Sequence, residues 1–171
     1  MTLTRPHKLG LALAAATFLL DQAIKWLVIG PLDLPQVLQI ELLPIFDLTW
    51  TENHGVSLGL LTAGSETQRW MLVALTAVIA LVVAVWLLRE KKPGDVLPLG
   101  LVLGGALGNI LDRVRLGYVA DYADLHFGTF RPFLIFNLAD AVITIGVAII
   151  LARSLLLREK PEAKPDPSPE S

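Results

Sequence analysis

Four long apolar blocks constrain the fold of this 171-residue chain more than any other feature. They cover residues 9–30, 70–88, 96–114 and 133–157. Each block is close to the ~20 residues that an α-helix needs to cross ~30 Å of hydrocarbon. Hydrophobic residues make up 54% of the chain and the mean hydropathy is +0.61, which is well above the range of soluble domains. The sequence therefore predicts an α-helical polytopic membrane protein with four transmembrane helices.

A second pattern lies between the first two blocks, at about residues 36–60. Apolar residues alternate there with polar ones, with a break at Pro44, and the apolar members are Leu38, Ile40, Leu42, Phe46, Leu48 and Trp50. A period of two is typical of half-buried strands, so we expect a small β-sheet between helices 1 and 2. We expect residues 1–160 to form one membrane-embedded domain. Residues 161–171 are rich in Pro, Glu, Lys and Ser, which predicts a disordered tail.

The distribution of basic residues indicates the orientation. Nine Lys and Arg residues flank the blocks on the side of the two termini, whereas the other side has Arg69, Arg115 and Arg131. Because cytoplasmic segments carry the excess of Lys and Arg, both termini and the tail are expected in the cytoplasm, and the sheet outside it. The polar residues of the blocks then gather at the outer leaflet boundary. They are Asp21, Lys25, Asn109, Asp112, Arg113, Asn137 and Asp140.

Two local patterns describe how the helices are expected to pack. Asp21 and Lys25 are four residues apart, the spacing of an ion pair on a helix, and we expect Lys25 to extend toward the lipid headgroups. In the third block, Gly100, Gly104 and Gly108 recur every four residues. Such a stripe of small residues lets two helix backbones approach closely in lipid.

Asp140 is the most informative polar residue, because a carboxylate inside a span is costly and indicates function. Asn137, three residues earlier, would share its helix face. Two neighbouring carboxyl groups can share one proton, so that one activates water and the other donates to a substrate carbonyl. The residues leave three candidate partners for Asp140, namely Asp112, Asp121 and Asp124. Asp121 is favoured, because Asp112 is expected to be a structural anchor and Asp124 would point to the other side of a strand.

Other functions are weaker alternatives. A Ser57–Lys25 dyad is possible chemically, but nothing in the sequence brings the two residues together. There is no cysteine, and the three histidines lack metal-ligand spacing, so neither a metal nor a cofactor is expected. Nucleic acid is not an expected partner. A small transporter would spread its carboxylates across the membrane, and a purely structural subunit would leave Asp121 and Asp140 without a role.

Five motifs occur in order along the chain. They are Asp21-Gln22-x-x-Lys25, Asn53-x-Gly55, Gly104-Gly105-Ala106-x-Gly108-Asn109-x-x-Asp112-Arg113, Val119-x-Asp121-Tyr122 and Phe136-Asn137-x-Ala139-Asp140. Together with four spans, they resemble the bacterial prolipoprotein signal peptidase (signal peptidase II) family. Two departures bear on substrate fit. Tyr122 stands where the family often has Phe, and Ser57-Leu58 stands where a small residue and an aromatic one are frequent.

The resemblance implies an aspartic endopeptidase of the bacterial inner membrane, with its active site near the outer leaflet. The sequence does not determine the oligomeric state, and a monomer is favoured. Its partners would be membrane lipid and the signal peptide of a prolipoprotein, which it would remove by cutting before a cysteine that carries diacylglycerol. The resemblance assigns catalysis to Asp121 and Asp140. Substrate binding or bracing of the site is expected for Asn53, Gly55, Asn109, Asp112, Arg113, Asn137, Asp21 and Lys25.

Overall fold

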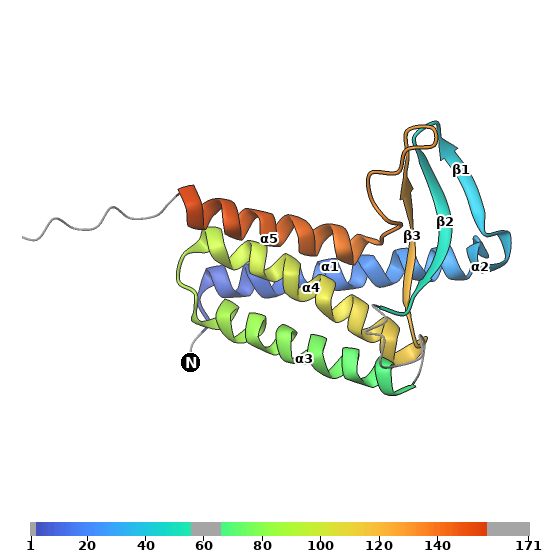
Figure 1. Cartoon of the computed structure of the whole chain (residues 1–171). Helices are drawn as coiled ribbons and strands as arrows, with labels where there is room; N and C mark the ends of the chain where they lie inside the picture. The colour runs from blue at the N-terminus through green and yellow to red at the C-terminus, as the bar shows by residue number, and fades with distance from the viewer. Residues whose placement is uncertain (1–2, 56–65, 157–171) are drawn as a thin grey trace, which may run out of the picture.

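The computed structural model describes residues 3–55 and 66–156. Four of its helices are long and apolar enough to cross a membrane: α1 (Arg5–Ile29), α3 (Glu66–Arg89), α4 (Pro93–Arg115) and α5 (Leu138–Leu156). The prediction of four transmembrane helices is confirmed. The helices lie side by side, and the β-sheet projects from one end of the bundle (Figure 1). The start of α1 and the end of α5 lie at the opposite end.

All four helix starts differ from the predicted ones, with α3 beginning at Glu66 rather than at residue 70 and α4 at Pro93 rather than at residue 96. Helix α1 begins at Arg5 rather than at residue 9, because Thr4 and His7 form a capping box and Pro6 occupies the first turn. Helix α5 begins at Leu138, five residues after the predicted start at 133. The apolar residues before Leu138 are not helical, and Phe136 forms a β-bridge with Ala123. Hydrophobicity alone does not separate such a segment from the helix that follows it.

Helix α4 is the centre of the bundle, with α1, α3 and α5 all packed against it. The glycines of the predicted stripe lie on its face toward α1. A Cβ on Gly100 would overlap the carbonyl oxygen of Gly10, and one on Gly104 would overlap that of Ala14. The stripe therefore sets how closely α1 and α4 approach.

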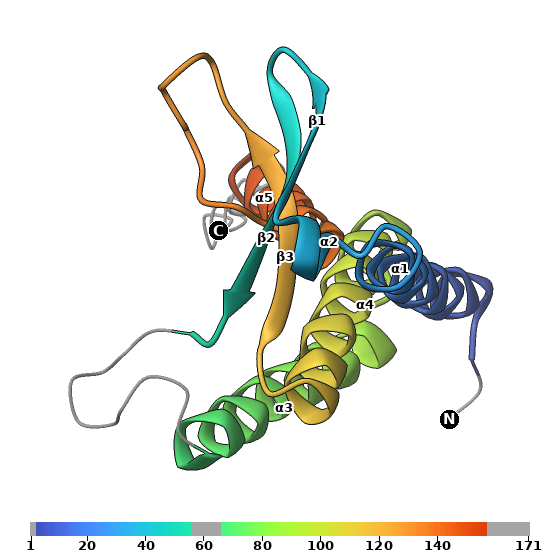
Figure 2. The same cartoon turned by 90° about the vertical axis from the view of Figure 1, so that its right-hand side faces the viewer.

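The predicted sheet is present and has one more strand than expected. Strands β1 (Gln39–Leu43) and β2 (Phe46–Asn53) come from the alternating region, after a short helix α2 (Leu34–Val37). Strand β3 (Val119–Leu125) pairs with β2, and the sheet is antiparallel in the order β1-β2-β3. Figure 2 shows this sheet lying across the end of the bundle, with β3 starting beside α4. This arrangement brings β3 close to the first turn of α5, as the Ala123–Phe136 bridge also shows.

Candidate active site

Asp121 is the third residue of β3 and is 1% exposed. Its Oδ2 accepts a hydrogen bond of 2.9 Å from Asn53 Nδ2, and its Oδ1 accepts one of 2.6 Å from Asn137 Nδ2. Asn53 is the last residue of β2, and the strand register, which pairs Thr51 with Asp121, makes Asn53 its diagonal neighbour. Two elements therefore converge on the Asp121 carboxylate.

The Gly55 backbone orients the Asn53 side chain. Its N–H donates to Asn53 Oδ1 at 2.9 Å, which leaves the Asn53 NH₂ group directed at Asp121. Gly55 has a φ of +85°, in the left-handed region that favours glycine. The Asn-x-Gly motif thus has a local physical reason, since the turn determines which end of the amide faces the carboxylate.

Asp140 occupies the first turn of α5, where it forms a reciprocal cap with Asn137. The Asp140 N–H donates to Asn137 Oδ1 at 3.0 Å, and the Asn137 N–H donates to Asp140 Oδ2 at 3.3 Å. The second carboxylate oxygen, Oδ1, accepts a hydrogen bond of 2.8 Å from Asn109 Nδ2 on α4. Two of these three hydrogen bonds involve backbone N–H groups at the start of α5. The position of Asp140 therefore depends on where α5 begins.

Asn137 connects the two aspartates. Its side-chain NH₂ donates to Asp121, while its side-chain oxygen and backbone N–H cap Asp140. It is completely buried. Burial, and then the negative charge of Asp140, raise the pKa of Asp121 to about 6, although the hydrogen bonds from Asn53 and Asn137 act in the opposite direction. A carboxyl group of this kind can carry a proton near neutral pH.

The other two candidate partners of Asp140 lie in different surroundings. Asp124 is paired across the sheet with Asp47, and its carboxylate is held by Arg131 at 3.1 Å and by Thr49 at 3.2 Å. Asp112 contacts Lys25 and the backbone of Ala120. Among the described residues, neither of these carboxylates shares a hydrogen-bonding side chain with Asp140, whereas Asp121 shares Asn137 with it.

Lys25 does not extend to the headgroups, and that expectation is wrong. It is 2% exposed, and its Nζ lies 2.9 Å from Asp21 and 2.7 Å from Asp112. It also donates to Asn109 Oδ1 at 3.3 Å. The reason is the seam between α1 and α4: Gly108 has no side chain, and a Cβ there would overlap the Asp21 carboxylate. The seam therefore leaves room for the charged groups inside the protein.

Lys25 is accordingly unsuited to the base role of the Ser57–Lys25 alternative, because three oxygen atoms surround its ammonium group. Ser57 itself lies outside the described residues.

Arg113 lies next to this group of residues on α4. Its Nη1 donates to the Asn109 carbonyl at 3.4 Å, and Arg69 donates to the Arg113 carbonyl at 2.7 Å. Arg113 interacts electrostatically with Asp140, Asp121 and Asp112. Its Nε is buried and has no hydrogen-bond partner in the part of the chain that the structure describes. A buried donor of this kind is available to a polar group of a ligand.

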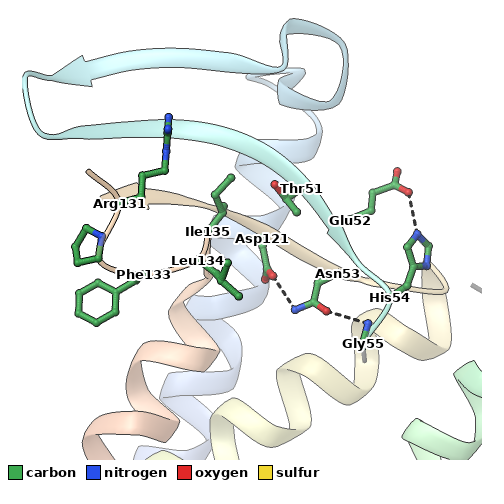
Figure 3. A pocket seen from close by; sticks show the side chains of 11 residues that line it. Thr51, Glu52, Asn53, His54, Gly55, Asp121, Arg131, Phe133, Leu134 and Ile135 are labelled. Carbon is green, nitrogen blue, oxygen red and sulfur yellow. Dashed lines mark hydrogen bonds and ion pairs between the residues drawn. The ribbon is translucent and has the colours of Figure 1, made fainter. Parts of the chain in front are cut away.

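A cavity of about 740 Å³ opens beside Asp121. Asn53 and Asp121 point toward one another on one side of it, and Phe133 and Leu134 lie on the other (Figure 3). A second, almost entirely apolar hollow of about 320 Å³ includes Asp140 and shares Phe133 and Leu134 with the first. Leu134 is 91% exposed. The two carboxylates thus border adjoining hollows, one partly polar and one apolar.

Two residues, Gln22 and Tyr122, make contacts at the site that the sequence does not predict. Gln22 donates to Asp21 and Asp112, both at 3.1 Å, and the Tyr122 hydroxyl accepts the Leu138 N–H at 3.2 Å. Both residues belong to the motifs on which the resemblance is based. The motifs indicate that these positions matter, but they do not show which residues Gln22 and Tyr122 contact. Sequence spacing within α1 cannot indicate that Gln22 faces α4, since the pairing of these helices depends on the bundle.

The fold and the site together define a polytopic membrane protein with two linked carboxylates at one end of its helices. The family described as "Signal peptidase (SPase) II" matches residues 13–156. A lipoprotein signal peptidase of Sphingopyxis alaskensis is 57% identical over 161 residues, covering 92% of this chain and 93% of that protein. One of Rhizorhabdus wittichii is also 57% identical, over 92% of this chain and 91% of that protein.

Solved structures support the same conclusion. A bacterial membrane enzyme determined at 1.9 Å resolution has a TM-score of 0.71 and 25% identity, covering 88% of this chain and 94% of that one. Another, at 2.3 Å resolution, shares the fold with a TM-score of 0.65. The chain belongs to the signal peptidase II family. It is therefore a multi-pass membrane peptidase of a bacterial family, and this assignment replaces the transporter and structural-subunit alternatives.

Proposed function

We propose that this protein is an aspartic endopeptidase that removes the signal peptides of prolipoproteins, cutting before a cysteine that carries diacylglycerol. Asp121 and Asp140 are the proposed catalytic pair. The observation that carries the proposal is the position of Asn137, which donates to Asp121 and caps Asp140. The names of the relatives, lipoprotein signal peptidases at 57% identity, support the substrate class.

The proposed mechanism uses one proton shared by the pair. Asp121 carries this proton, because burial and the charge of Asp140 raise its pKa to about 6. Asp140 is the proposed base, and Asn109 and the Asn137 N–H both donate to its oxygen atoms. Asp140 takes a proton from water as the water oxygen attacks the peptide carbonyl carbon, and Asp121 donates its proton to the carbonyl oxygen. The C–N bond then breaks as Asp140 returns a proton to the leaving amine, and Asp121 regains one from the collapsing hydroxyl group.

The substrate is proposed to lie across the two hollows. The peptide would bind in the cavity beside Asp121, where Asn53 and Gly55 would orient its backbone, and the acyl chains or signal helix would occupy the apolar hollow beside Asp140. Arg113 lines neither hollow and would brace the pair through its charge. Asn109 and Asn137 hold the carboxylates, and Asp21, Lys25 and Asp112 brace them. This chemistry requires no metal or cofactor.

The proposal includes a location. The enzyme would lie in the bacterial inner membrane as a monomer, with residues 1–160 as one membrane domain, both termini in the cytoplasm and the site near the outer leaflet. The charge asymmetry along the sequence supports this orientation. The sheet lies at the end of the bundle opposite the start of α1 (Figure 1), and the residues that line both hollows come from this sheet, the segment before α5 and the first turns of α5.

The experiment replaces each aspartate by its neutral isostere. Asp121→Asn and Asp140→Asn should each abolish cleavage, with diacylglyceryl-modified precursor accumulating in cells whose own enzyme is depleted. Asp124→Asn is the matched control, because Asp124 is a buried aspartate of the same strand held by Arg131 and Thr49. Normal lipoprotein maturation by either Asp121→Asn or Asp140→Asn, at wild-type protein levels, would refute the pair.

A further inference from the structure

We propose that the buried ammonium group of Lys25 is a positioning device that fixes the spacing between Asp121 and Asp140. It acts through two carboxylates, Asp21 and Asp112, and these three residues are called the ion cluster below. The inference rests on the proposed function, since the spacing matters only if the pair is catalytic. Three sets of contacts carry it.

The first set ties each carboxylate of the ion cluster to the backbone beside one member of the pair. Asp21 Oδ1 accepts the Ala139 N–H at 3.1 Å, one residue before Asp140. Asp112 Oδ2 accepts the Ala120 N–H at 3.2 Å, one residue before Asp121. Two carboxylates from α1 and α4 thus hold the start of α5 and the start of β3 in the same way.

The second set joins the two carboxylates to each other. Lys25 Nζ lies 2.9 Å from Asp21 and 2.7 Å from Asp112, and Gln22 Nε2 donates to both at 3.1 Å. Asp21, Lys25 and Asp112 are all 3% exposed or less. A continuous path of short contacts therefore runs from Ala139 through the ion cluster to Ala120.

The third set orients Asn109. Lys25 donates to Asn109 Oδ1 at 3.3 Å, and an amide whose oxygen faces an ammonium group presents its NH₂ group elsewhere. Here that group donates to Asp140 Oδ1 at 2.8 Å. Lys25 thus acts on Asp140 from two directions, through the α5 backbone and through the side chain of Asn109.

The cost of burying charges suggests that the ion cluster serves to position the pair rather than to stabilise the fold. Taking charges out of water costs free energy that their attraction need not recover, and apolar residues of similar volume often stabilise a fold as well as a buried ion pair does. What such a cluster provides is a fixed geometry between elements. A displacement of about 1 Å between reacting groups can lower a rate by about 100-fold, so a fixed spacing has a direct kinetic value.

The test separates spacing from folding with a charge-conserving double variant. Lys25→Met together with Asp112→Asn removes the ammonium link but leaves the cluster with one net negative charge and with an oxygen that can accept the Ala120 N–H. Lys25→Met alone is the more disruptive comparison. Lys8→Met is the matched control, because Lys8 lies exposed on the same helix. Each purified variant is assayed for melting temperature in detergent and for kcat and KM on a diacylglyceryl-cysteine peptide.

We expect the double variant to melt within about 5 °C of the wild type, because it leaves one carboxylate without a cation, Asp21, instead of two, and Asp21 keeps its hydrogen bonds from Gln22 and the Ala139 N–H. Its kcat should fall about 100-fold while its KM changes less than about threefold. The pH profile provides an independent readout. Asp121 faces Asp140, Lys25 and Arg113, and the positive charge of Lys25 lowers the pKa of Asp121, so the alkaline limb of kcat/KM should move to higher pH.

Two results would overturn the inference. One is a double variant with wild-type kcat and an unmoved alkaline limb. The other is a double variant that fails to fold, because this would assign the ion cluster to stability. Asp140→Asn, measured in parallel, distinguishes these results from failure of the proposed function: if Asp140→Asn still cleaves the peptide, the catalytic pair itself is wrong.

Discussion

Replacement of Asn53 by alanine removes one of the two side-chain donors to Asp121, the 2.9 Å hydrogen bond from Asn53 Nδ2. This donor favours the ionised carboxylate, so its loss should raise the pKa of Asp121 above about 6. A hydrogen bond to a charged group contributes about 1.5–3 kcal/mol, and one pKa unit corresponds to about 1.4 kcal/mol, which gives an upper limit of about two units. Asn53 borders an open cavity, where water can replace part of the bond, so we expect a shift of about one unit.

The sign of the effect on activity follows from the shared proton. Asp121 must be protonated to donate to the carbonyl oxygen, and it loses its proton as the pH rises through its pKa. In the wild type, kcat/KM should therefore decline above about pH 6. In Asn53→Ala the proton is retained to about pH 7. At pH 7.5 the fraction of enzyme with a protonated Asp121 is then roughly eightfold larger than in the wild type.

The assay is kcat/KM between pH 4.5 and 9 for the purified enzyme in detergent, with a diacylglyceryl-cysteine peptide as substrate. Each profile is normalised to its own plateau, because Asn53 also lines the cavity and its loss should lower the plateau. Gln39→Ala is the matched control: Gln39 donates to Asp47 at 2.7 Å, the same kind of amide–carboxylate bond in the same sheet. An alkaline limb that moves to lower pH in Asn53→Ala, or that moves equally in Gln39→Ala, refutes the reasoning.

Three further outcomes are expected. The neutral form of Asp121 favours the folded state below about pH 4, and this contribution of up to about 3 kcal/mol is lost as the pH rises from 3.8 through about 6. Asp121→Asn should therefore melt up to about 10 °C above the wild type at pH 8 but near it at pH 4, and an equal difference at both pH values would contradict this. Tyr122→Phe leaves the Leu138 N–H without its acceptor and should lower the melting temperature by a few degrees, with cleavage retained. Gly100→Ala places a Cβ against the Gly10 carbonyl and should cost about 1–3 kcal/mol in thermal unfolding, whereas at an open helix position the same change would stabilise by about 1 kcal/mol.

Strand β3 shows where sequence patterns stop being informative. Residues 38–50 alternate between apolar and polar, and this alternation predicted both strands, although exposure does not alternate strictly along either one. In β3, by contrast, six of the seven residues are buried, Asp121 and Asp124 among them. A strand that is buried on both faces and contains two aspartates has neither alternation nor an apolar run, so no periodic pattern in the sequence predicts β3.

The start of α5 was misplaced for a related reason. Residues 133–136 are apolar, like the helix that follows, so composition joined them to it. In the structure, Phe133 and Leu134 line the hollows and Phe136 pairs with Ala123. Asn137, Leu138 and the residues after them then begin the helix with a complete set of caps. The sequence shows where the apolar segment ends, but two of the acceptors that cap the first N–H groups of α5 belong to other elements: Asp21 lies in α1 and Tyr122 in β3.

The sequence by itself determined the four spans, two of the three strands and the membership of Asp121 and Asp140 in one set of motifs. These features depend on segment length, periodicity and spacing along the chain, which are local quantities. Only the tertiary structure decided that Lys25 is buried between Asp21 and Asp112, and that Asn137 contacts both aspartates of the proposed pair. Those contacts join α1, α4, α5 and the sheet. Their geometry depends on the distance between α1 and α4, which the glycine stripe of α4 keeps short. This distance cannot be predicted from either segment alone.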